Sequence, residues 1–336
     1  MRIQPRPRHE RFAGLSCYTA NLAGYLDAEL PDVDGYLARS VRLAVRVDLP
    51  AGRLAFSHHG YPLDRTPDGG RLRYATLPPR AALVGLADEL ARHGRVLVVT
   101  DGSRLPWSPS RHRGAGAPHW VLVTGRRGHS WHVIDAFAGL LPGGEQRPYV
   151  GWLSAAQLTN AMVLPDRWSA EQQLRNSLAF GFPVAVPDPA GPVWLRREPA
   201  AAPSIGLAAP PTPDRPSALP GTWLVGDRDV LPFLADRFVT SAVAARHLDD
   251  LWTSAAHRAF RYRWLCAQPD LPEALRRRYR DARAAWERLP GALRFAVDSA
   301  GRGRARPTLL RRTFDHLLEV DPAQDPFLTS PRREAQ

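Results

Sequence analysis

The sequence has 336 residues, which is enough for one large or two ordinary domains with an extensive hydrophobic core. It carries 45 basic and 33 acidic residues, a formal net charge of +12, and this excess favours an acidic partner. No apolar run reaches the roughly 18 residues of a membrane span, and no zinc-finger or RNA-recognition signature is present. We therefore expect neither a membrane nor a nucleic-acid partner.

The N-terminal residues 1–10 read as an extended lead-in without the apolar core of a signal peptide. The chain has two cysteines, Cys17 and Cys266, too few for a disulfide framework. We expect both thiols to be reduced and the protein to be cytoplasmic.

A helix is predicted to begin at Cys17. Gly14 marks a turn, Ser16 is a plausible N-cap, and the apolar residues that follow recur at helical spacing: Tyr18, Leu22, Tyr25 and Leu26. A thiol in the first turn lies at the positive end of the helix dipole, which favours the thiolate. The alternative is that Cys17 is a small buried hydrophobic residue, the usual fate of a free cysteine.

Strands are predicted over 41–47, 53–57 and 72–77, a helix over 78–94 and a buried strand from 95, which ends at the turn Asp101-Gly102. Asp101 and Ser103 either line a cleft at this strand end or cap their own turn. His58 and His59 are adjacent, so in a strand they face opposite sides, and no carboxylate or cysteine spacing supports a metal site.

The segment 117–137 is predicted to be a β-hairpin, with the three-residue loop Arg126-Arg127-Gly128 between two runs rich in Val, Ile and Trp. Pairing the strands about Arg127 places His119 directly opposite Asp135, on one face of the sheet. A slip of one residue would separate the two side chains onto opposite faces.

Helices are predicted over 154–164 and 169–180. From 183 to 221 the chain is rich in Pro and Ala and reads as a linker or a mobile lid. From Val230 onward the pattern is helical, with aromatic residues at core spacing, and Cys266 among them is expected to be inert.

Cys17, His119 and Asp135 together have the residue types of thiol catalysis. The imidazole takes the thiol proton, the thiolate attacks an acyl carbon, and the carboxylate orients the imidazole. Papain-like folds place the parts in this way, with the cysteine-bearing helix packed against the sheet that carries the histidine.

Three stretches resemble the N-terminal domain of the butirosin biosynthesis protein H family: Gly14-Leu-Ser-Cys-Tyr-Thr-Ala-Asn-Leu, Val98-Val-Thr-Asp-Gly-Ser-Arg-Leu-Pro-Trp, and His119-Trp-Val-Leu-Val-Thr-Gly with Val133-Ile-Asp135. The resemblance covers roughly residues 11–165. It implies a papain-like α+β fold and an acyltransferase that moves an acyl or aminoacyl group from an acyl carrier protein thioester to an amine. The helical tail loosely resembles the region often fused to such domains.

By this resemblance Cys17 is the nucleophile, His119 the general base and acid, and Asp135 the orienting residue. Asp101, Ser103 and Trp107 become candidates for substrate binding. Related peptidases carry a glutamine a few residues before the cysteine, whereas the nearest here is Gln4. The resemblance therefore leaves the backbone N–H of Cys17 as the candidate oxyanion donor.

The sequence thus predicts a papain-like catalytic domain over 1–165, a connecting segment over 166–222 and a helical domain over 223–325. The expected partners are an acidic acyl carrier protein and a small amine acceptor, without a cofactor or metal. Two alternatives stay open, a peptidase or thioester hydrolase with the same three residues and a non-catalytic scaffold of the same fold.

Overall fold

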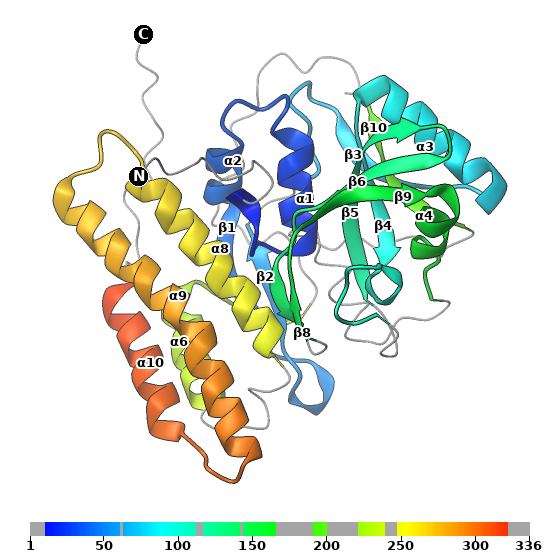
Figure 1. Ribbon diagram of the computed structural model, residues 1–336. Coiled ribbons are helices and arrows are strands. Elements are labelled where there is room, and N and C mark those ends of the chain that lie inside the picture. Colours follow the sequence, from blue (N-terminus) through cyan, green and yellow to red (C-terminus); the bar gives the residue numbers. More distant parts are fainter. Residues whose placement is uncertain are drawn as a thin grey trace, which may run out of the picture. The chain divides into compact units, whose positions relative to one another are not determined.

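The computed structural model describes residues 11–60, 63–111, 117–141, 144–165, 191–199, 221–238 and 247–321 (Figure 1). The predicted lead-in over 1–10, the predicted helix over 169–180 and most of the predicted linker lie outside these residues. The chain forms two compact units. The first combines residues 1–33 with 61–217, and the second combines 34–60 with 218–336.

The first unit is built on a six-stranded antiparallel sheet in the order β3-β10-β4-β5-β6-β9. Its strands are β3 (Arg71–Thr76), β4 (Val96–Asp101), β5 (Pro118–Arg127), β6 (Ser130–Asp135), β9 (Tyr149–Ser154) and β10 (Val193–Glu198). A short ribbon of β7 (Gly139–Leu141) and β8 (Gly144–Gln146) follows β6. The fold is therefore mixed α and β with antiparallel pairing, as the sequence predicts.

Helices cover both faces of this sheet (Figure 1). Val121 and Val123 of β5 belong to the core formed with α3 (Pro79–His93) and α4 (Ala155–Ala161). The side chain of Leu122 points to the opposite face of the sheet, where it lies beside α1 (Cys17–Leu26). The α1 helix thus packs on the sheet face opposite α3 and α4.

The ends of α1 and α3 follow from local chemistry. The Ser16 hydroxyl accepts a hydrogen bond from the backbone N–H of Thr19 at 3.2 Å, which confirms Ser16 as the N-cap and Cys17 as the first helical residue. At the far end of α3, Gly94 takes a left-handed conformation with φ of 69°, and its N–H bonds to the Leu90 carbonyl.

The predicted hairpin is present, but its predicted register is wrong. The loop has two residues rather than three, because Arg127 pairs with Ser130. Further from the loop, toward His119, Val123 pairs with Val133 and not with Trp131. Continuing this register places Asp135 opposite Val121, so Asp135 is a diagonal neighbour of His119 rather than its direct partner.

A β-bulge keeps His119 and Asp135 on one face of the sheet. Gly125 pairs with His132, and the Thr124 hydroxyl lies 2.7 Å from the His132 Nδ1, so two residues of β5 stand opposite one of β6. Without this extra residue, the pairing set by the turn would continue with Asp135 opposite Leu122, whose side chain points away from His119. The predicted register missed by two residues, and an even shift preserves the face.

The second unit joins a three-stranded antiparallel sheet to a group of helices. The sheet has the order β11-β1-β2, from β1 (Val41–Arg46), β2 (Ala55–His59) and β11 (Trp223–Val225). The helices are α2 (Val33–Ser40), α6 (Asp227–Phe238), α8 (Leu248–Cys266), α9 (Glu273–Gly301) and α10 (Pro307–Val320). Its core combines strand residues such as Val45 and Phe56 with Tyr279 and Trp286 of the helices, which confirms the packing role predicted for these two aromatic residues.

Two predicted domain boundaries differ from the structure. Residues 34–60 were expected in the first domain, but they belong to the second unit, where β1 pairs with β11 and packs against the C-terminal helices. The predicted connecting segment 166–222 contains β10, which lies inside the six-stranded sheet between β3 and β4. Within the described residues, no helix is both long and apolar enough to cross a membrane.

Candidate active site

Cys17 lies at the first position of α1, with a free and partly exposed thiol. The helix dipole and the unpaired N–H groups of the first turn favour negative charge at this position. The Ser16 cap fixes where the helix begins, so it also fixes this placement of the sulfur.

His119 and Asp135 form a buried hydrogen-bonded pair. The His119 Nε2 lies 2.8 Å from the Asp135 Oδ2. Only 7% of His119 and none of Asp135 is exposed to solvent. The Phe137 ring meets the imidazole edge-on, with centroids 5.6 Å apart. Because Asp135 occupies Nε2, the other ring nitrogen, Nδ1, is the one left to exchange a proton with a thiol.

Five donors surround the Asp135 carboxylate. Oδ2 accepts from His119, from the Trp107 indole at 2.8 Å and from the Gln146 side chain at 2.9 Å. Oδ1 accepts from the Asn21 side chain at 3.2 Å and from the Phe137 backbone N–H at 3.1 Å. A buried carboxylate with this many donors is held in its ionised form.

The electrostatics favour a charged imidazole beside Asp135. Burial by itself lowers the pKa of His119, but the negative charges of Asp135 and Cys17 and their hydrogen bonds outweigh it, so the pKa lies well above its ordinary value. Burial raises the pKa of Asp135, but the charge of His119 and the donated hydrogen bonds outweigh that, and the pKa is lowered. Cys17 therefore lies close enough to His119 to interact with its charge.

Asn21, for which the sequence predicted no role, joins the helix to both strands of the hairpin. It lies one helical turn after Cys17 and is fully buried. Its Nδ2 donates to the Trp120 carbonyl at 2.7 Å and to Asp135, while its Oδ1 accepts from the Ala136 N–H at 3.0 Å. The available signal was the spacing Cys17-x-x-x-Asn21, which puts both residues on one side of a helix.

Trp107 has a structural partner that the prediction of substrate binding did not foresee. Besides its bond to Asp135, its ring stacks on Tyr149 with centroids 3.9 Å apart and planes 6° apart. Gln146 of β8 donates to the same carboxylate oxygen and is also buried. Both residues therefore orient Asp135, which in turn orients His119.

Asp101 and Ser103 make the turn contacts that the sequence left open as the alternative to a cleft. The Asp101 Oδ1 accepts from the Ser103 backbone N–H at 2.8 Å and from its hydroxyl at 2.7 Å. This is the self-capping of a turn after a strand. These bonds account for both side chains without a ligand, and their role in substrate binding stays a prediction.

In the part of the chain that is described, no group of three or more His, Cys, Asp or Glu side chains is arranged to hold a metal ion. His58 and His59 of the second unit do meet a third histidine. The His257 ring stacks on His58 and contacts His59 edge-on, with centroids 4.8 and 5.1 Å apart. Burial lowers the pKa of His59 and of His257 well below the ordinary value, and the charges of neighbouring histidines lower it further, so these two imidazoles are uncharged at neutral pH.

The first unit thus brings together a thiol at a helix start, an imidazole and an orienting carboxylate. This set can pass a proton from the sulfur to the imidazole and back to a leaving group. No protein-family model matches the sequence, and no curated protein is found that is similar to it.

Proposed function

We propose that this chain is a cysteine-dependent acyltransferase with a papain-like catalytic unit, in which Cys17 is the nucleophile, His119 the general base and acid, and Asp135 the orienting residue. The observation that carries the proposal is the position of His119. Its Nε2 is fixed by the buried Asp135, while the charge of Cys17 contributes to the high pKa of the same ring.

In the proposed reaction, Nδ1 of His119 takes the Cys17 proton and the thiolate attacks the carbonyl carbon of an acyl thioester. The bond between that carbon and the carrier sulfur breaks, and His119 returns its proton to the departing thiol. An amine then attacks the acyl-cysteine, His119 accepts the amine proton, and the acyl bond to Cys17 breaks as the sulfur is reprotonated. The backbone N–H of Cys17 at the helix start is the proposed donor to the oxyanion.

The proposed acyl donor is an acidic acyl carrier protein, because the chain carries a formal net charge of +12. We place the reaction in the cytoplasm, where free thiols persist, and both cysteines are free. In this scheme Asn21, Trp107 and Gln146 are positioning residues that act through Asp135.

Intact-protein mass spectrometry tests the covalent step. The wild type, Cys17→Ala and Cys266→Ala are each incubated with a panel of acyl carrier thioesters. Cys266 is the matched control because it is also a partly exposed free thiol, but burial raises its pKa and it has no imidazole partner in this scheme. We expect an acyl adduct on the wild type and on Cys266→Ala, and none on Cys17→Ala.

Adding amines to the acylated protein separates transfer from hydrolysis. Release of an acyl-amide supports the transferase, whereas release of the free acid at the same rate with and without amine indicates a thioester hydrolase or peptidase. Absence of any adduct, together with slow alkylation of Cys17 at neutral pH, would refute thiol catalysis and leave a scaffold of the same fold.

A further inference from the structure

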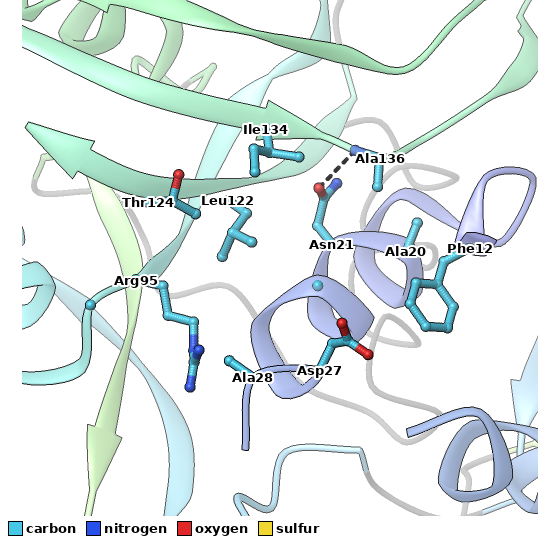
Figure 2. A pocket seen from close by; sticks show the side chains of 12 residues that line it. Phe12, Ala20, Asn21, Asp27, Ala28, Arg95, Leu122, Thr124, Ile134 and Ala136 are labelled. Atoms are coloured by element: carbon cyan, nitrogen blue, oxygen red, sulfur yellow. Dashed lines mark hydrogen bonds between the residues drawn. The ribbon is translucent and has the colours of Figure 1, made fainter. Parts of the chain in front are cut away.

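A pocket of about 300 Å³ lies between the far part of α1 and the sheet of the first unit (Figure 2). Its walls are mainly apolar, with Leu122 and Ile134 from the sheet and Ala20 and Gly24 from the helix. At about 30 Å³ per water-sized group, it holds on the order of ten non-hydrogen atoms. This volume is at the lower end of the range for small-molecule sites.

The apolar floor of the pocket continues across the sheet beyond α1. Leu122 pairs with Ile134, and Ile134 pairs with Val150 of β9, so the three side chains form one row across three neighbouring strands. Val150 is 44% exposed, and Trp152 on the same face of β9 is 41% exposed. An elongated apolar ligand that fills the pocket therefore has an apolar path outward along this row.

The charged groups at the pocket already have partners. Asp27 accepts a hydrogen bond from Arg11 at 3.1 Å, and Arg95 is paired with Glu29. The Thr124 hydroxyl is bonded to His132. Since each charged residue described at the pocket already has a counter-charge, a charged ligand would lose its hydration without gaining an ion pair from these residues. The pocket therefore favours an uncharged ligand.

Asn21 connects this pocket to the candidate active site. It lines the pocket, and Figure 2 shows its hydrogen bond to the Ala136 N–H at the pocket wall. The lining continues past the end of α1 at Leu26, about 14 Å along the helix from Cys17 at 1.5 Å per residue, to Asp27 and Ala28. The pocket thus lies between the sheet and the helix that carries the thiol, on the side of that helix where Asn21 donates to Asp135.

The geometry points to a second ligand site in this pocket, which binds an uncharged straight aliphatic chain of about ten non-hydrogen atoms. This aliphatic ligand lies on the row formed by Leu122, Ile134 and Val150. By filling the space beside Asn21 it stabilises the seating of α1 on the sheet, and with it the hydrogen bonds of Asn21. The inference does not depend on the proposed acyl transfer, because the site is defined by shape and charge alone.

Isothermal titration of the full-length Cys17→Ser protein with octanamide tests the site without any contribution from thiol chemistry. Octanoate and octylamine are the charged probes of matched chain length. We expect saturable binding of octanamide, at least tenfold tighter than either charged probe. Equal or tighter binding of a charged probe, or no binding of octanamide, would overturn the inference.

Two matched pairs of variants locate the binding. Ala28→Phe adds bulk at the pocket, and Ala81→Phe adds it on the exposed start of α3. Ile134→Gln puts an amide in the apolar row, and Val84→Gln makes the same change at a valine that is 61% exposed. We expect at least tenfold weaker octanamide binding for the two pocket variants and no change for the two controls. Unchanged binding in both pocket variants, each verified as folded by circular dichroism, would refute this location.

Discussion

Replacing Asp135 by asparagine is the sharpest test of the five hydrogen bonds that the Asp135 carboxylate accepts at the candidate site. The substitution keeps the shape of the side chain but removes its charge and turns one acceptor oxygen into an NH₂ donor. If the nitrogen takes the Oδ2 position, it faces the Trp107 indole N–H, and if it takes the Oδ1 position, it faces the Phe137 backbone N–H. Neither of these groups can become an acceptor.

The expected cost follows from these contacts. In either orientation one buried donor is left without an acceptor, which costs about 1–3 kcal/mol of stability. The charge-assisted hydrogen bond to His119 is also lost, which costs about 1.5–3 kcal/mol. The free energy of unfolding should therefore fall by about 4 kcal/mol. For a unit of this size the melting temperature should drop by roughly 8–16 °C.

Asp101→Asn is the matched control, because Asp101 is also a buried carboxylate at a strand end. Both of its bonds from Ser103 reach Oδ1, so the new nitrogen can take the Oδ2 position, where Arg104 lies at 3.6 Å. We expect a cost below about 1 kcal/mol. Chemical denaturation followed by circular dichroism measures both variants. An equal loss of stability in Asp135→Asn and Asp101→Asn would refute the stabilising role of the donors around Asp135.

Three further outcomes are expected. His119→Ala should slow iodoacetamide alkylation of Cys17 up to about 100-fold at pH 6.5 and only a few-fold at pH 9, because an ordinary thiol is about 1% ionised at the lower pH; equal rates at pH 6.5 would contradict the proposed pairing. Burial lowers the pKa of His59 and His257 below the unfolded value. Their contribution to the free energy of unfolding is therefore present above about pH 6.5 and is lost as pH falls, at about 1.4 kcal/mol per pH unit for each residue. Thermal melts of His257→Gln over this pH range should show about half of this loss, and the same dependence of stability on pH as in the wild type would contradict it. Gly94→Ala should lower the stability by about 1 kcal/mol, since φ is 69° while the added methyl group meets no atom; Gly94→Asn should cost less, and equal melting temperatures for wild type and Gly94→Ala would count against a left-handed cap.

Local sequence signals predicted most elements whose residues interact with near neighbours. The helix start at Cys17 and the end of α3 at Gly94 were found because caps and left-handed glycines act within one turn. Strand β10 was missed because it follows a Pro-rich and Ala-rich stretch, and its place between β3 and β4 depends on residues about 100 positions away. The same holds for β1, whose packing against the C-terminal helices no local pattern indicates.

For the candidate site, the sequence predicted the residue types and the shared face of His119 and Asp135, but not the residues that hold them. Asn21, Gln146 and the indole of Trp107 converge on one carboxylate from three separate elements. Such convergence is a property of the folded chain. The exact pairing of the hairpin was also beyond prediction, since a bulge changes the register without a strong sequence signature.

The bulge at Thr124 and Gly125 also separates the hairpin into two parts with different tolerance of length change. Changes confined to the exposed loop around Gly128 alter only the tip, because the bulge and the pairs of Val123 and Leu122 lie between the tip and the site. A single-residue deletion at the bulge changes the length of only one strand, so it would turn the carboxylate and the imidazole to opposite sides of the sheet. Loop grafts and tags at the tip should therefore be accepted, while the bulge residues tolerate substitution better than deletion.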